Sequence, residues 1–205
     1  MFLSITGEST LAEVRGGYQT RMFEVFPGGK LTLTQLKLSG GSFEGSGGAI
    51  YSHSAALVLD SCTFQGNVAA DGDGGAVWAE RGNITIIRGE FLDNNASVYG
   101  GAVAAAGVSS LVVQGGDTSF TSNIATGANE ELSLLDDLSE GVDGGGAVAF
   151  LFASANIADS VFDGNNAQFS GGALLGGNGT YITVDGCKFE NNTAMEHGGA
   201  IAAAS

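Results

Sequence analysis

The fold is decided by residues 64–77, which read FQGNVAADGDGGAV. This stretch joins two signatures, Phe-x-x-Asn-x-Ala and Gly-Gly-Ala followed by an aliphatic residue. Both signatures return along the chain in fixed alternation. Self-similarity at a fixed period is typical of solenoid proteins, in which each repeat stacks on its neighbours.

The spacing of the copies gives the length of the repeat. The Gly-Gly-Ala copies start 27, 26, 45, 26 and 27 residues apart, so the repeat is about 26 residues long and the one long step marks an insertion of about 19 residues. The first signature occurs at 64–69, 91–96, 120–125, 162–167 and 189–194. The second occurs at 47–50, 74–77, 100–103, 145–148, 171–174 and 198–201.

Short segments between the signatures have the alternation and β-branched residues of strands, as in Ile84–Ile87 and Tyr181–Val184. We expect about three strands of three to five residues per repeat, separated by glycine or asparagine corners. Each strand would pair in parallel with its counterpart one repeat later, and parallel crossovers are almost always right-handed. The sequence therefore predicts an all-β fold, a right-handed single-stranded parallel β-helix of about six to eight coils.

Two slots of the repeat are expected to form columns along the axis. The phenylalanines would point inward and stack as rings in the core: Phe64, Phe91, Phe120, Phe162 and Phe189. The asparagines tolerate left-handed corners, and their amides can bond the same residue in the next coil: Asn67, Asn94, Asn123, Asn165 and Asn192.

The two signatures resemble the chlamydial-type polymorphic membrane protein repeat family, whose motifs are Gly-Gly-Ala-[Ile/Leu/Val] and Phe-x-x-Asn. The resemblance runs from about Gly47 to the C-terminus. It implies a parallel β-helix that, in chlamydial members, forms the surface-exposed passenger of an autotransporter and acts in adhesion. The outer-membrane barrel of those proteins is not found in this sequence. Similar repeats also occur in large extracellular proteins of eukaryotic microbes.

We interpret residues 1–205 as a single β-helix domain. Residues 1–46 would form initial coils, 47–205 the repeats, and 126–143 an acidic insertion with a short helix capped by Asn129. The last residues begin a fresh coil without a polar cap, which exposes strand edges. We therefore expect a part of a longer chain or assembly, with protein partners and end-to-end stacking on itself or a related β-helix.

The charge balance excludes several classes of partner. The chain has 22 acidic and 7 basic residues, a formal net charge of −15, so it repels nucleic acid and anionic membrane surfaces. No apolar run reaches the ~20 residues of a transmembrane helix. The start, Met1–Gly7, lacks the basic residues and long apolar run of a signal peptide.

Cysteines and sequons bear on the compartment. Cys62 and Cys187 share one repeat slot four coils apart, or ~19 Å, which is too far for a disulfide, so both are interpreted as small core residues. Four Asn-x-Ser/Thr sequons are glycosylation candidates and favour a secreted or cell-surface glycoprotein: Asn83, Asn95, Asn178 and Asn191. Asn95 and Asn191 adjoin ladder positions and are expected to face solvent.

Few residues remain for chemistry. His53 and His197 lie about five coils apart, and Asp71-Gly-Asp73 is interpreted as an acidic turn because it lacks the other ligands of a calcium loop. We predict no catalytic, cofactor or metal residues and a non-enzymatic extracellular scaffold, adhesin-like or part of a surface or appendage assembly. The alternative is a polysaccharide lyase, hydrolase or epimerase, or a carbohydrate-binding β-helix. The enzyme alternative would need carboxylates gathered beside Arg81 or Arg88.

Overall fold

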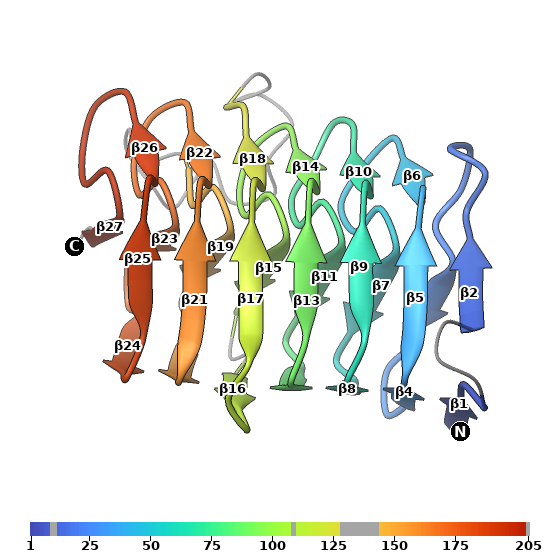
Figure 1. Ribbon diagram of the computed structural model, residues 1–205. Coiled ribbons are helices and arrows are strands. Elements are labelled where there is room, and N and C mark those ends of the chain that lie inside the picture. Colours follow the sequence, from blue (N-terminus) through green and yellow to red (C-terminus); the bar gives the residue numbers. More distant parts are fainter. Residues whose placement is uncertain (9–11, 108–109, 128–143, 204–205) are drawn as a thin grey trace.

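The computed structural model describes residues 1–8, 12–107, 110–127 and 144–203. These residues form 27 strands and no helix, and the strands are stacked as a β-solenoid of about seven turns. Figure 1 shows the chain rising through the front strands, passing over the top, descending at the back and starting the next coil further to the left. This path is right-handed, so the predicted fold class is confirmed.

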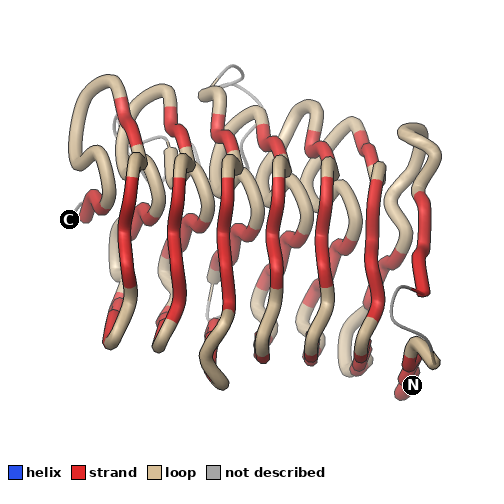
Figure 2. Tube along the Cα trace, in the orientation of Figure 1, coloured by secondary structure: helices blue, strands red, loops and turns tan. Residues whose placement is uncertain are grey.

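The coil that begins at Ile50 illustrates the order of strands in each full coil. It runs through β7 (Ile50–His53), β8 (Ala56–Asp60), β9 (Thr63–Gln65) and β10 (Val68–Ala69). Four strands per coil correct the expectation of three. The extra strand has only two residues, Val68–Ala69 in this coil, and it lies inside the Phe-x-x-Asn-x-Ala signature, where no alternation can be read. Figure 2 shows how loops separate these short strands.

All neighbouring strands in the four sheets pair in parallel. The lower sheet contains β1 (Phe2–Thr6), β4 (Lys30–Thr34), β8, β12 (Asn83–Ile87), β16 (Ser110–Gln114), β20 (Ser154–Ala158) and β24 (Tyr181–Asp185). The front sheet contains β2 (Ala12–Arg15), β5 (Leu36–Ser39), β9, β13 (Glu90–Leu92), β17 (Thr118–Thr121), β21 (Ser160–Asp163) and β25 (Lys188–Glu190).

The remaining two sheets close each coil. The back sheet contains β3 (Phe23–Val25), β7, β11 (Val77–Glu80), β15 (Val103–Ala106), β19 (Val148–Leu151), β23 (Leu174–Gly176) and β27 (Ile201–Ala203). The upper sheet contains β6 (Ser42–Phe43), β10, β14 (Asn95–Ala96), β18 (Ile124–Ala125), β22 (Asn166–Ala167) and β26 (Thr193–Ala194). Residues 1–46 contribute β1–β6. Strands β3–β6 pair in register with the repeats, and β1 and β2 pair with β4 and β5.

The main core is the inside of the coil, and a second buried cluster around Trp78 lies on the other face of the back sheet. In the lower sheet every second side chain from β4 to β20 is buried, as in β8, where Leu57 and Leu59 point inward and Val58 points outward. The register places like residues above one another, for example Phe64 beside Phe91. Each buried aliphatic or aromatic side chain contributes about 1.5–3 kcal/mol through removal of apolar surface from water. Each coil therefore buries an apolar side chain at the same position of the repeat, and each such side chain stabilises the solenoid.

The insertion was predicted over residues 126–143. Its first residues, Thr126 and Gly127, follow β18, and Gly144 is the next residue that the structure describes. Residues 128–143, with the helix predicted from Asn129, lie outside the described residues.

Candidate functional surfaces

The five signature phenylalanines stand in one column inside the coil. Consecutive ring centroids are 4.8–4.9 Å apart and the ring planes differ by 3–9°. The spacing equals the distance between neighbouring strands, so the backbone register imposes the stacking. The first four rings, Phe64 to Phe162, are fully buried, and Phe189 in the last coil is partly buried.

The signature asparagines form a continuous chain of hydrogen bonds beside that column. Asn94 Nδ2 donates to Asn123 Oδ1 at 3.0 Å and to the carbonyl of Phe64 at 3.0 Å. Its own Oδ1 accepts from Nδ2 and from the backbone N–H of Asn67, at 2.9 and 3.1 Å. The same pattern continues through Asn165 to Asn192. The four fully buried amide groups, from Asn67 to Asn165, are thus satisfied, which a buried polar side chain requires.

The Gly-Gly-Ala signature brings backbones together at the edge of the back sheet. A Cβ atom placed on Gly75 would lie 2.1 Å from the carbonyl oxygen of Gly101 in the next coil. Only glycine permits this approach between coils. The alanine that follows, Ala76, is fully buried. The residues of both recurrent signatures therefore serve contacts between coils.

The two cysteines are free and lie in the core wall. Cys62 is buried and Cys187 is half-buried in the last coil. Burial raises the pKa of both thiols, with backbone hydrogen bonds opposing the shift. A thiol with a raised pKa is a poor nucleophile at neutral pH.

The glycosylation candidates differ in exposure. Asn83 is exposed on β12, although its Oδ1 accepts a hydrogen bond from Ser110. Asn191 is exposed and donates Nδ2 to Asp163 Oδ1 at 2.9 Å. Asn95 and Asn178 are half-buried, and the sequon serine of Asn95, Ser97, is 8% exposed. Asn83 and Asn191 are therefore the exposed candidates of the four, and the use of any of them as a glycan site stays a prediction.

Charged residues outside the core form small, separate pairs. His53 Nδ1 lies 2.8 Å from Glu80 Oε2, and His197 is exposed in the last coil. Arg81 pairs with Glu80 at 2.8 Å and Arg88 with Asp60 at 2.7 Å. In the part of the chain that the structure describes, no three metal-ligating side chains form a group.

A half-buried arginine on the flank, Arg21, was missed by the sequence reasoning. The Arg21 guanidinium lies 3.7 Å from the centroid of the Phe43 ring and 4.7 Å from that of Tyr51. It also donates to the carbonyl of Ser46 at 3.2 Å. Burial lowers the pKa of Arg21, and the neighbouring Glu24 opposes that shift. Phe43, Ser46 and Tyr51 lie 22–30 positions from Arg21, so only the stacking of coils brings them to it.

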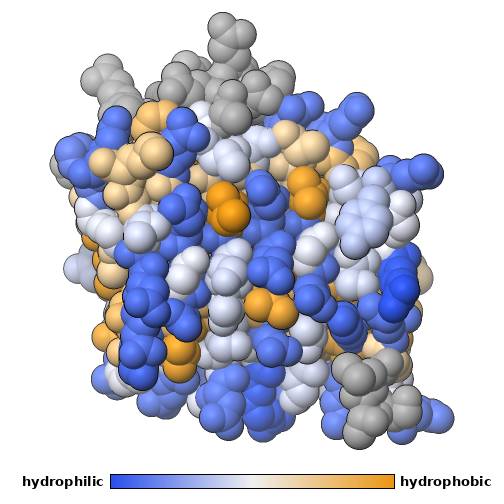
Figure 3. Space-filling model, turned by 45° about the horizontal axis from the view of Figure 1, so that its top comes forward, coloured by the Kyte–Doolittle hydropathy of each residue, from blue (hydrophilic) through white to orange (hydrophobic). Residues whose placement is uncertain are grey.

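The front sheet presents the side chains that change from coil to coil. Its inward positions repeat, whereas one outward position carries Ser39, Gln65, Leu92, Thr121 and Asp163 in successive coils. Figure 3 shows a largely hydrophilic surface on which apolar residues are scattered. Among the described residues, no helix is long and apolar enough to cross a membrane.

Comparison with known proteins identifies the repeat. The sequence model of the Chlamydia polymorphic membrane protein repeat matches residues 61–80 and 186–204, each of which contains one Phe-x-x-Asn and one Gly-Gly-Ala signature. Searches of curated proteins and of solved structures returned no match. The resemblance seen in the sequence is confirmed for these two repeats.

Proposed function

We propose that this chain, a β-solenoid with polymorphic membrane protein repeats, is a non-enzymatic cell-surface scaffold with an adhesive role. The family is surface-associated, which supports a surface location. One observation carries the proposal. The recurrent side chains all serve the contacts between coils, while the outward positions of the front sheet vary and face solvent. Such a rod holds a sequence-variable surface on a rigid frame.

The location is tested with antibodies raised against the purified chain and applied to the cells that produce it. Labelling of intact cells, removed by brief external protease treatment, is expected for a surface scaffold. Labelling that appears only after the cells are permeabilised would refute the proposal.

Adhesion is tested separately, by counting beads coated with the chain that remain bound to a cell layer. A front-sheet variant, Gln65→Ala with Leu92→Ala and Thr121→Ala, is expected to lose most of the binding. Its matched control changes outward residues of the same coils on the lower sheet, Val58, Ile87 and Val112, to alanine. Equal bead binding by the two variants would exclude the front sheet as the adhesive face.

A further inference from the structure

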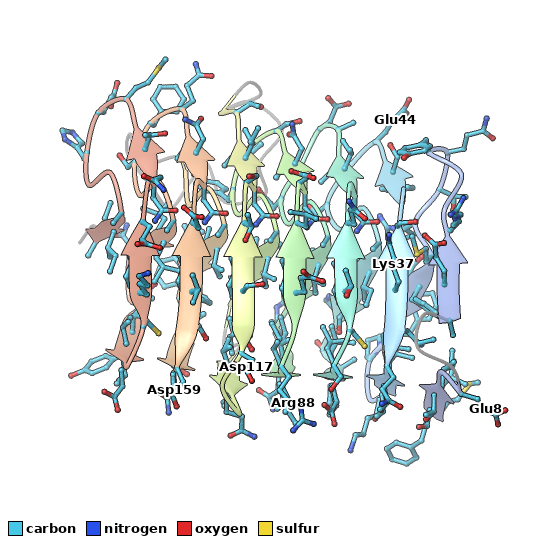
Figure 4. All side chains as sticks on the ribbon, in the orientation of Figure 1. Glu8, Lys37, Glu44, Arg88, Asp117 and Asp159 are labelled. Atoms are coloured by element: carbon cyan, nitrogen blue, oxygen red, sulfur yellow. The ribbon has the colours of Figure 1, made fainter. Side chains whose placement is uncertain are left out.

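A groove lies across the first four coils at the upper end of the front sheet. Its walls are outward side chains of β2, β5 and β9 together with the corner that follows β13. The volume of the groove is about 540 Å³, within the range of ~300–1,000 Å³ usual for sites that bind small ligands. Lys37, labelled in Figure 4, stands on β5 in this part of the sheet.

An exposed tyrosine ring forms one wall. Tyr18 is 71% exposed, and its backbone N–H donates to the carbonyl of Gly40 at 2.8 Å. Its ring covers Gly40 so closely that a Cβ atom there would lie 3.0 Å from Cζ. The ring is thus fixed against the solenoid on one face, while most of its surface remains in solvent. An anchored aromatic ring of this kind is a stacking platform for a ligand.

The next coil leaves a hollow beside that platform. Gly66 follows Gly40 in the same corner, and a Cβ atom built on it would have no neighbour within 4 Å. The left-handed corner does not itself require glycine, because Asp93 and Asn191 adopt it in later coils with φ of 54° and 52°. Glycine at position 66 therefore leaves open space that a side chain would fill.

The polar groups of the groove are balanced in charge. Glu13 accepts from Ser39 at 2.6 Å and pairs with Arg15 at 2.8 Å and Lys37 at 4.0 Å. The Ser39 and Arg15 hydrogen bonds lower the pKa of Glu13, so it stays ionised. With Asp93 on the opposite wall, the groove holds two cations and two anions.

This balance is unlike the rest of the chain. Residues 1–46 carry four of the seven basic and four of the 22 acidic residues, so the whole net charge of −15 belongs to residues 47–205. A neutral groove on an otherwise acidic rod disfavours an anionic ligand. Hydroxyl groups can bond to the amide of Gln65, the carboxylate of Asp93 and the ammonium of Lys37 alike.

We infer that this groove binds an uncharged oligosaccharide. A sugar ring would lie with its C–H face on Tyr18, since aromatic faces are electron-rich and attract weakly positive C–H groups. Its hydroxyls would reach the polar side chains above the hollow at Gly66. The inference rests on the proposed function and gives the adhesive scaffold a class of receptor.

The test uses the full chain on an array of neutral and acidic oligosaccharides, followed by calorimetric titration with the strongest neutral binder. Tyr18→Ala is expected to weaken binding about tenfold. Gly66→Asn is expected to abolish binding by filling the hollow, because asparagine tolerates this backbone conformation. The matched control is Gly164→Asn, at the same corner four coils from Gly40, where the nearest atom to a Cβ is 3.7 Å away. The control should bind as the unchanged chain does.

Three results would overturn the inference: binding to acidic glycans alone, no binding to any glycan, or equal effects of Gly66→Asn and Gly164→Asn. Thermal melting of each variant separates loss of the groove from loss of the fold. If intact cells are labelled but no glycan binds, the scaffold proposal stands and the groove assignment fails.

Discussion

Removal of one ladder amide tests how the coils are held together. Asn123 is fully buried, and its side chain makes four hydrogen bonds. In Asn123→Ala the backbone N–H of Asn94 and one hydrogen of its Nδ2 lose their acceptor. Asn165 Oδ1 still accepts from the backbone N–H at position 123. Each orphaned buried donor costs about 1–3 kcal/mol, so the free energy of unfolding should fall by about 4 kcal/mol.

The matched control is an asparagine one coil away that lies outside the ladder. Asn166 is exposed, and its Nδ2 donates to Thr193 Oγ1 at 2.7 Å. Asn166→Ala should change the free energy of unfolding by about 0.5 kcal/mol or less, because water replaces the lost partner. Both variants are unfolded in guanidinium chloride and followed by far-UV circular dichroism, with the slope against denaturant compared to check that the same structure unfolds. A loss under about 1 kcal/mol in Asn123→Ala, equal to that of the control, would refute the role of the ladder.

Three further predictions concern the core and the open coil edge. Phe120→Ala should lower the free energy of unfolding by about 3–5 kcal/mol, because its ring stacks on a neighbouring ring on each side. Phe189→Ala should lower it by less, because among the described residues its ring stacks on Phe162 alone. Thermal melting of the two variants checks this order. Iodoacetamide at pH 8 should modify Cys187 faster than Cys62. Burial raises the pKa of both thiols, but Cys62 is buried whereas Cys187 is half-buried and more accessible to the reagent. Mass spectrometry that finds Cys62 modified first would contradict this prediction. If two copies of this chain stack end to end on β27, the last strand of the back sheet among the described residues, Ile201→Lys there should reduce self-association in sedimentation velocity. An unchanged distribution of species would exclude β27 as the contact.

The sequon asparagines show that the alternation of residues along a strand does not by itself predict how exposed a side chain is. Alternation predicts that Asn95 faces away from the core beside the ladder position Asn94, and it does occupy an outward position. It is nevertheless half-buried, because the coils above and below pack against the short upper strands. Exposure depends on the neighbouring coils as well as on direction.

The sequence by itself determined the period, the parallel stacking and the columns of Phe and Asn. In a solenoid the residue beside any side chain is its own counterpart one repeat later, so the spacing of signatures fixes the register without knowledge of distant contacts. Phe91 meets Phe64 for that reason alone. Only the tertiary structure decided the two-residue fourth strand, the Arg21 pocket between Phe43 and Tyr51, and the ring of Tyr18 over Gly40. These contacts join residues at different positions of the repeat. They depend on the geometry of the coil corners, which cannot be read from the repeat period.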